Sequence, residues 1–438
     1  MRLVHLTPGT GNFFCGSCLR DNALVTALRR LGHDALMLPM YLPHVVDESS
    51  TAAGEPIFFG GINVYLQQKS AFFRNTPRWL DKFFDSSAML RAAAQKAGMT
   101  TPEELGELTL SMLRGENGHQ SKELEKLIDW LRDQRPDVVC LSNSMLLGLV
   151  RRIRAELGAT VICSLQGEDS FLDSLPEPYR AQCWNTARER AGDVSFFVAP
   201  SNFYADFMRE RLAVEPEKMR VIHNGIDLDG FAPASQPPDA PTIGFLSRMC
   251  AQKGLHTLVD AFIELKKHGC VPGARLRVAG SRTAADLPYL NELLGRLETS
   301  GFAGDAEFFP NVTRAEKIAF LQSLSVLSTP TCYEEAFGLF VIESLACGVP
   351  VVEPRRGAFP ELIDLTGGGV LCEPDDVGSL ADTLEALLLD HERARALALC
   401  GYDAVLKRFT SEAMAREFAQ LCEAAAGSNT FAATTQTS

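Results

Sequence analysis

The stretch SVLSTPTCYEEAFGLFVIESLACGVPVVEPRRGAFPE, residues 325–361, indicates most clearly how this chain folds. Its apolar run 325–329 is typical of a buried strand, and a polar loop follows it. Residues 339–347 are predicted to form a helix that ends at Gly348, because glycine is the usual residue just after a helix. A second apolar run, 349–352, completes a β-α-β unit, which indicates a parallel sheet.

Two glutamates of this unit call for more than a structural interpretation. Glu343 lies among apolar helix residues, so its carboxylate is at least partly buried and needs a partner, either a local ion pair or a ligand. Glu335 lies eight residues earlier, at the carboxyl end of a strand, where open α/β sheets bind their ligands. Phe337, Gly338 and Leu339 then lead into the helix, whose free N–H groups suit a phosphate. Carboxylates beside an anion site predict a ligand that carries both hydroxyls and phosphate, such as a nucleotide sugar.

Two cations are predicted at the same edge of this sheet. Arg248 follows the predicted strand 242–247, and Lys253 opens the next helix, at the end where the helix dipole disfavours a positive charge. Solvated surface charge is the alternative for each residue taken singly. Beside Glu335 and Glu343, an anionic ligand explains the pair of cations better.

Three segments carry a resemblance to a known family. The segment EAFGLFVIE, residues 335–343, with the CGVPVV that follows it, resembles the E-x7-E motif of retaining glycosyltransferases, specifically glycosyltransferase family 4 (group 1). FLSRMCAQKGLHTLVDAF resembles the family pattern in which Arg and Lys hold the donor diphosphate, and MRVIHNGIDLDGFAP resembles the hinge segment before it. The resemblance covers residues 137–418 and is weaker before them. It implies the GT-B fold, with C-terminal helices that return to the N-terminal domain.

The order of strands and helices predicts an α/β protein of two Rossmann-like domains facing a cleft. The first domain is predicted over residues 1–231, and the second, which would bind the nucleotide sugar, over 242–425. Residues 232–241 hold four prolines and are interpreted as the linker. Residues 426–438 are predicted to be a disordered tail.

The resemblance also implies an activity and a role for each site residue. The activity is retaining transfer of a hexose from a nucleoside diphosphate sugar to a hydroxyl of a glycan or glycolipid. Glu335 would hold the hydroxyls of the sugar, and Glu343 those of the ribose. Arg248 and Lys253 would stabilise the charge that develops on the diphosphate.

The glycine-rich loop after the first strand predicts no cofactor. Residues 9–11 could begin a dinucleotide fingerprint, but its third glycine is missing. Cys15 and Cys18 have no second pair or histidine partner, so a redox or metal role is disfavoured. Small residues here, with Gly16 among them, would let the loop approach the donor closely.

We predict no metal either. Asp227 and Asp229 match the Asp-x-Asp metal motif of the other main glycosyltransferase fold. They follow an Asn-Gly turn within the segment that resembles the family hinge, so a chance match is the better interpretation.

Polar residues follow two predicted strands of the first domain. Asn143 follows strand 137–141, and Gln166 and Asp169 follow strand 160–165. These three residues are the predicted contacts to the sugar or the acceptor. Family members often carry a histidine where Gln166 stands, and glutamine can hydrogen-bond a hydroxyl but cannot titrate near neutral pH.

Composition restricts the partners and the compartment. The net charge of −13 argues against nucleic acid as a partner. Twelve cysteines, several of them in apolar runs, suit a reducing compartment, and no signal peptide or membrane span is recognisable, so a cytoplasmic location is expected. The aromatic and basic segment 71–90 is interpreted as core or, alternatively, as an acceptor-facing helix with weak peripheral membrane contact.

Two alternatives to a transferase stay open at this point. A sugar-nucleotide epimerase or hydrolase of the same fold would turn the donor over without an acceptor. A non-catalytic nucleotide-sugar-binding protein, suggested by Gln166, would bind the donor without turnover.

Overall fold

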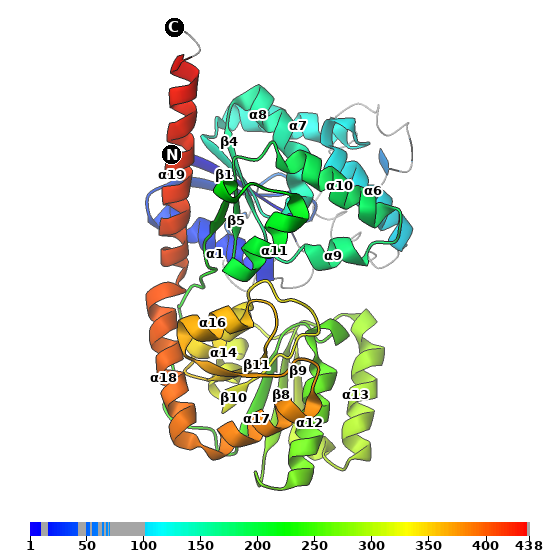
Figure 1. Cartoon of the computed structure of the whole chain (residues 1–438), viewed down its shortest axis with the longest axis vertical. Helices are drawn as coiled ribbons and strands as arrows, with labels where there is room; N and C mark the ends of the chain where they lie inside the picture. Colours follow the sequence, from blue (N-terminus) through cyan, green and yellow to red (C-terminus); the bar gives the residue numbers. More distant parts are fainter. Residues whose placement is uncertain are drawn as a thin grey trace. The chain divides into compact units, whose positions relative to one another are not determined.

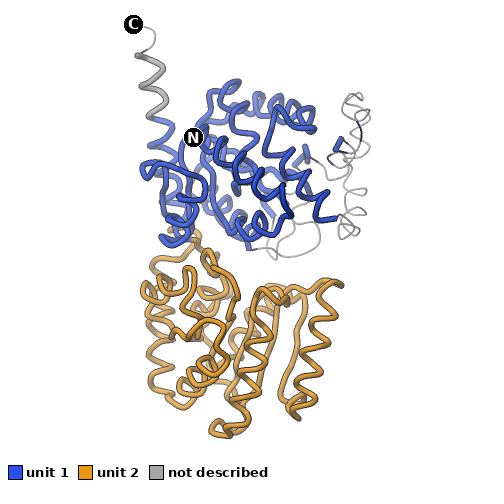
Figure 2. Tube along the Cα trace, turned by 45° about the vertical axis from the view of Figure 1, so that its right-hand side comes forward, with its two compact units in different colours: residues 1–223, 414–438 blue, residues 224–413 orange. Residues whose placement is uncertain are grey.

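A computed structural model of the chain describes residues 1–9, 16–42, 50–52, 55–59, 64, 67–68, 70 and 101–435, with side chains as far as residue 427. The chain divides into two compact units (Figure 2). Unit 1 comprises Met1–His223 and Met414–Ser438, and unit 2 comprises Asn224–Ala413.

Unit 1 is built on a six-stranded parallel sheet in the order β2-β1-β3-β4-β5-β6. The strands are β1 (Arg2–Thr7), β2 (Asp34–Pro39), β3 (Val138–Leu141), β4 (Thr160–Ser164), β5 (Phe196–Ala199) and β6 (Met219–Val221). The chain runs outward from β1 to β2 and then returns to β3 on the other side of β1. This reversal is the point at which open α/β sheets bind ligands.

The helices of unit 1 pack on this sheet or on one another. They are α1 (Gly16–Arg30), α6 (Pro102–Arg114), α7 (Ser121–Gln134), α8 (Val150–Leu157), α9 (Asp169–Ser174), α10 (Tyr179–Ala191), α11 (Asn202–Leu212) and α19 (Ser411–Thr435). Leu24 of α1 and Phe418 of α19 lie in one core with Val138 and Ile162 of the sheet, so α1 and α19 cover one region of it (Figure 1).

Unit 2 repeats the architecture with the order β12-β11-β10-β7-β8-β9, again all parallel. The strands are β7 (Thr242–Leu246), β8 (Arg275–Gly280), β9 (Ala306–Pro310), β10 (Val326–Leu327), β11 (Val351–Pro354) and β12 (Gly369–Cys372). Its reversal of strand order lies between β7 and β10, the two strands that lead into the predicted site segments.

Helices cover both faces of the second sheet. They are α12 (Leu255–His268), α13 (Leu287–Thr299), α14 (Arg314–Gln322), α15 (Leu339–Ala346), α16 (Phe359–Thr366), α17 (Val377–Leu389) and α18 (His391–Arg408). Phe245 of β7 packs in a core with α12 and α17, and the next residue, Leu246, packs in a separate core with α15. Because neighbouring strand residues point to opposite faces, the two cores lie on the two sides of the sheet.

The predicted fold class is confirmed, while the unit boundaries differ from the predicted domains. The units divide after His223, so residues 224–231 group with unit 2 instead of the first domain. Ile226 explains the difference, because its N–H donates to the carbonyl of Phe409 at 2.9 Å and its carbonyl accepts from the N–H of Ser411 at 2.8 Å. The residues of α19 from Met414 onward return to unit 1, as the family resemblance implied.

The C-terminal segment also differs from its prediction. Helix α19 runs to Thr435, through most of the segment predicted to be a disordered tail. Residues 436–438 lie outside the described part of the chain.

Candidate functional site

Two loops at the β7–β10 reversal are joined closely. Lys253 does not open α12 as predicted; it ends a short 3-10 turn, and α12 starts two residues later. Gly254 between them has φ +74°, and a Cβ on it would lie 1.7 Å from the carbonyl oxygen of Pro330. The N–H of Cys332 donates to the carbonyl of Gln252 at 2.9 Å. The loop after β7 and the loop after β10 therefore form one surface.

Lys253 and Glu335 meet on this surface. Lys253 Nζ lies 2.7 Å from Glu335 Oε2, and both groups contact the hydroxyl of Tyr333. The side chains of Lys253 and Glu335 are 21% and 14% exposed. Burial lowers the pKa of Lys253, but the charge of Glu335 and the hydrogen bonds to Glu335 and Tyr333 outweigh it and raise this pKa above its usual value. Lys253 therefore stays a cation across the physiological pH range.

The backbone of Glu335 is held by the end of the same β-α-β unit. Gly357 has φ +58°, and a Cβ on it would lie 2.5 Å from the Glu335 nitrogen. The N–H of Ala358 donates to the Glu335 carbonyl at 2.9 Å, and that of Gly357 donates to the Glu334 carboxylate at 2.6 Å. A side chain at position 357 would displace Glu335, so the glycine is part of the site.

Arg248 is the more exposed of the two predicted cations. Its Nη2 lies 3.1 Å from Asp286 Oδ1, and its side chain is 49% exposed. Asp286 also accepts from the N–H and the hydroxyl of Thr283 at 2.8 and 2.6 Å. Burial raises the pKa of Asp286, but these hydrogen bonds and the Arg248 charge lower it overall. Arg248 and Lys253, the two predicted phosphate ligands, thus each have a carboxylate partner. The sequence did not predict Asp286 as a partner of Arg248.

Glu343 forms an ion pair with Lys317. Its Oε1 lies 2.7 Å from Nζ of Lys317 on α14, and both side chains are largely buried. This is the local ion pair that the sequence left as one of two explanations for a carboxylate on an apolar helix. The predicted contact to ribose stays a prediction.

The start of α15 presents backbone rather than side chains. Gly338 has φ +93° and caps the helix without a side-chain hydrogen bond, and Leu339 is the first helical residue. Phe337 is buried, with its ring 6.1 Å from that of Phe409. Contacts of these residues to a ligand would therefore come from their N–H groups.

In unit 1, Gln166 belongs to a buried polar cluster around Asp21. The Asp21 carboxylate contacts five groups: the Thr7 hydroxyl at 3.1 Å, the Ser142 hydroxyl, Arg20 Nη1 at 3.1 Å, Gln166 Nε2 at 3.0 Å and His5 Nε2 at 3.1 Å. Gln166 Nε2 also donates to the Ser142 carbonyl at 2.8 Å. We refer to His5, Arg20, Asp21, Ser142 and Gln166, with Thr7, as the Asp21 cluster.

The charges of the Asp21 cluster shift the pKa values of His5 and Asp21. Burial lowers the pKa of His5, but the Asp21 charge and hydrogen bond raise it to about 9. Burial raises the pKa of Asp21, but His5, Arg20 and Ser142 hold it well below its usual value. Both partners are therefore charged at neutral pH inside the protein.

The other predicted sugar or acceptor contacts are also engaged inside unit 1. Asn143 Oδ1 accepts from the N–H of Met145 at 3.1 Å, and Asp169 Oδ1 accepts from the Tyr204 hydroxyl at 2.6 Å. Gly16 is the exposed first residue of α1. Cys15 and the aromatic segment 71–90 lie outside the described residues, so the structure does not place them.

Sequence reasoning missed Tyr333 and Glu353. Tyr333 stands two residues before Glu335, so a search of the sequence for hydrogen-bond partners of this predicted site residue could have found it. Glu353 on β11 is fully buried, and both its oxygens lie 3.2 Å from the N–H of Thr329. Burial raises its pKa well above the usual value, with the Glu335 charge adding to the rise. An apolar strand gave no signal that this carboxyl lies beneath the site.

Asp227 and Asp229 form a turn. The N–H of Asp229 donates to Asp227 Oδ1 at 2.9 Å, and Arg314 donates to both backbone carbonyls. Within the described residues, no group of three or more His, Cys, Asp or Glu side chains is arranged to hold a metal. In the same part of the chain, no helix combines the length and the apolar character needed to cross a membrane.

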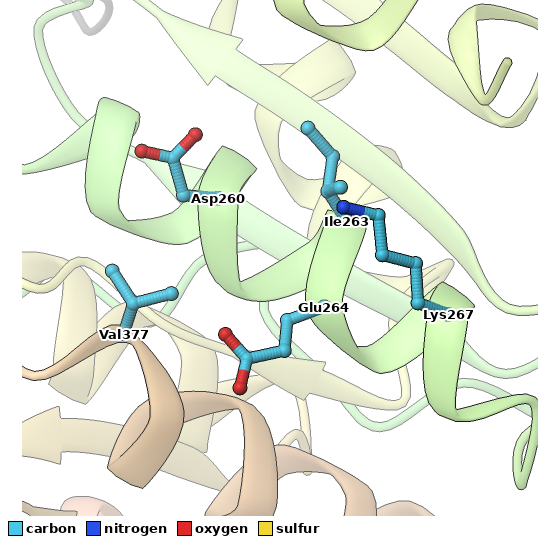
Figure 3. Close-up of a pocket in the computed structure, with 5 residues that line it drawn as sticks. All are labelled: Asp260, Ile263, Glu264, Lys267 and Val377. Atoms are coloured by element: carbon cyan, nitrogen blue, oxygen red, sulfur yellow. The ribbon is translucent and has the colours of Figure 1, made fainter. Parts of the chain in front are cut away.

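A surface hollow of about 380 Å³ lies elsewhere on unit 2 (Figure 3). It is lined by residues of α12 and α17: Asp260, Ile263, Glu264, Lys267 and Val377. None of the predicted site residues lines it, so we assign it no function.

Comparison with known proteins agrees with this arrangement. Residues 231–402 match the family of glycosyl transferases group 1, and residues 105–229 match glycosyltransferase family 4. The two matched segments, residues 105–229 and 231–402, are those of group 1 (family 4) glycosyltransferases. The resemblance inferred from the E-x7-E segment is confirmed.

Curated relatives match part of this chain. D-inositol 3-phosphate glycosyltransferase of Mycolicibacterium smegmatis is 29% identical over 186 residues, which is 40% of this chain and 41% of that protein. The corresponding protein of Mycobacterium sp. strain JLS is 28% identical over 183 residues, 40% of each chain. The chain thus spans about two fifths of the length of these relatives.

Solved structures match nearly the whole chain and show the GT-B fold. Sucrose-phosphate synthase from Thermosynechococcus elongatus superimposes with a TM-score of 0.70 at 18% identity, covering 96% of this chain and 98% of that one. HepE of Anabaena, solved with UDP and glucose, gives 0.67 at 16% identity, covering 97% and 100%.

Proposed function

We propose that this protein is a retaining glycosyltransferase that moves a hexose from a nucleoside diphosphate sugar to a hydroxyl of a glycan or glycolipid, without a metal. One observation carries the proposal. The Lys253–Glu335 pair lies at the sheet reversal, and Glu335 Oε1 accepts no hydrogen bond from any described residue. An ionised carboxylate with one anchored and one available oxygen suits a sugar hydroxyl.

Departure of the diphosphate is the step that most needs stabilisation. Lys253 keeps its charge, Arg248 is half exposed, and α15 begins after Gly338 with the free N–H groups of a helix N-terminus. Fixed positive charge at a leaving group stabilises the transition state more than the ground state. These three sources of positive charge are why we propose a metal-free reaction.

The donor and the stereochemistry follow from likeness to relatives. HepE of Anabaena was solved with UDP-glucose, so a UDP-sugar is the first donor to test. The E-x7-E segment resembles that of retaining enzymes, so the product should keep the anomeric configuration of the donor. Glu343 would bind the ribose through the oxygen that does not contact Lys317.

The test is release of nucleoside diphosphate from UDP-, ADP- and GDP-sugars, with and without EDTA. We expect slow release from one donor, unaffected by EDTA, lost in Lys253→Ala and Glu335→Ala and kept in Lys267→Ala, an exposed lysine of α12. Acceptors can then be screened with that donor, and NMR of the product reads the anomeric configuration.

Three outcomes would contradict parts of the proposal. Release that requires a divalent cation would contradict the metal-free site. Complete turnover of the donor with no acceptor would favour a hydrolase or epimerase of the same fold. Tight nucleotide binding with no turnover across a broad acceptor screen would favour a binding protein.

A further inference from the structure

Tyr333 occupies an unusual position between the two charged groups of the site. Its hydroxyl lies 2.9 Å from Glu335 Oε2 and also contacts Lys253 Nζ. The same Glu335 oxygen lies 2.7 Å from Lys253 Nζ. The three polar atoms therefore form a closed triangle, in which a neutral hydroxyl accepts from the cation and donates to the anion.

The triangle decides which hydrogen-bonding positions remain for a ligand. An ammonium group has three N–H donors, and Tyr333 and Glu335 take two of those on Lys253. The third donates to no described residue. Glu335 Oε2 accepts two hydrogen bonds, while Oε1 accepts none from the described part of the chain. One donor and one acceptor are thus left, each on a side chain that cannot turn freely.

Hydrogen bonds of the neighbouring backbone hold Tyr333 in place. Its carbonyl accepts from the Thr331 hydroxyl at 3.1 Å, and the preceding residue is hydrogen-bonded to the loop that carries Lys253. Burial raises the pKa of Tyr333, so its hydroxyl keeps its proton. A phenol fixed in this way orients both neighbours.

We propose that Tyr333 is a positioning residue of this site: it clamps Lys253 to one oxygen of Glu335 and so aims the other oxygen and the remaining ammonium N–H at the sugar diphosphate. The proposal rests on the function proposed above. It assigns to Tyr333 an effect on turnover that acts through Glu335 and Lys253.

The experiment compares Tyr333→Phe with the unaltered protein by kinetics and by chemical labelling. Loss of a hydrogen bond to a charged group should lower kcat by about 10- to 100-fold, with KM for the donor changed by less than about 3-fold. In a Glu335→Gln background the same substitution should have little further effect, because the two residues act together. Tyr289→Phe is the matched control, since its hydroxyl contacts His256 at 2.9 and 3.1 Å instead of the site; its kcat should stay within about twofold.

Labelling tests the position of Lys253 without any turnover. Acylation of Lys253 by an N-hydroxysuccinimide ester, measured by peptide mass spectrometry against the exposed Lys267, should become several-fold faster in Tyr333→Phe. The reason is that one of the two groups that keep the ammonium protonated is gone.

Each result has a definite meaning. Unchanged labelling of Lys253 overturns the proposal, and so does an unchanged kcat in an active enzyme. A loss of kcat that adds fully to that of Glu335→Gln would indicate general structural damage and would also overturn it. If the unaltered protein turns over no donor but labelling rises, the transferase proposal has failed while the clamp on Lys253 stands.

Discussion

Each of the two sheets carries a cluster of polar side chains at the carboxyl ends of its strands. The two clusters differ in how many of their hydrogen-bonding groups have a partner within the protein. In unit 1 the Asp21 carboxylate is fully buried and is surrounded by five groups of its own chain. In unit 2 the Glu335 side chain is 14% exposed, and one of its two oxygens accepts from no described residue. Polar residues at a strand end are thus not a sufficient sign of a ligand site; unused hydrogen-bonding capacity is the better sign.

The comparison separates structural from functional charge. A buried charge whose partners come from its own unit stabilises the fold, and removing one partner leaves the others uncompensated. A pair that is partly exposed contributes less to stability and can exchange its partner for a ligand. Structural and functional charges should therefore differ in how much their removal changes the free energy of unfolding.

Asp21→Asn should have the largest effect on stability. It removes the anion that compensates buried His5 and Arg20, which should cost about 3–5 kcal/mol. Urea unfolding of the variant measures this loss. The control is Asp34→Asn, an exposed partner of Arg2, for which a change below about 1 kcal/mol is expected. Equal losses in the two variants would contradict the structural role of the cluster.

The pH dependence of stability should report His5. Its pKa is raised to about 9 in the folded protein, so its contribution is complete below the unfolded value of about 6.5 and is lost as the pH rises through 9. The size is about 3 kcal/mol, from about 1.36 kcal/mol per pKa unit. Unfolding measured from pH 6 to 10 should show this decline, and His5→Gln should flatten it. A variant that declines as steeply as the original would exclude His5 as the cause.

Glu353→Gln should have a smaller effect of opposite sign. The raised pKa of this buried carboxyl means that the folded state holds its proton more tightly than the unfolded chain. Stability is therefore lost as the pH rises above the unfolded value of about 4.3. The amide cannot ionise, so the variant should be more stable at pH 7 by about 1 kcal/mol and lack that decline. Denaturant titrations at pH 4 and 7 give both numbers, and a destabilised variant at pH 7 would refute the argument.

Arg248→Ala should have the smallest effect on stability of these variants. Its main effect should be weaker binding of the donor. Arg248 itself is half exposed, and Asp286 keeps its two hydrogen bonds from Thr283, so we expect a loss below about 1 kcal/mol. The KM for the donor should rise about 10-fold, because a charge-assisted contact to phosphate is lost. Arg282→Ala, at a partly buried arginine of the same region, is the control. A large loss of stability with no kinetic effect would place Arg248 with the structural charges.

Much of the fold and part of the site could be predicted from local patterns. Helix α15 forms over Leu339–Ala346, where the sequence predicted a helix over residues 339–347 that ends at Gly348. The patterns that indicate helices and strands involve residues only a few positions apart, so they can be recognised from the sequence alone. The E-x7-E segment is equally local, and it indicated the family.

The sequence by itself therefore determined the elements, the two α/β units and the motif that names the family. Only the tertiary structure decided which partner each polar side chain takes, because those partners lie far along the chain. Lys253 and Glu335 are 82 residues apart, and Gln166 reaches Asp21 across 145 residues. The same holds for the unit boundary, where the pairing of Ile226 with residues 409–411 outweighs a proline-rich segment. Spacing along a chain carries no information on such contacts until packing brings the elements together.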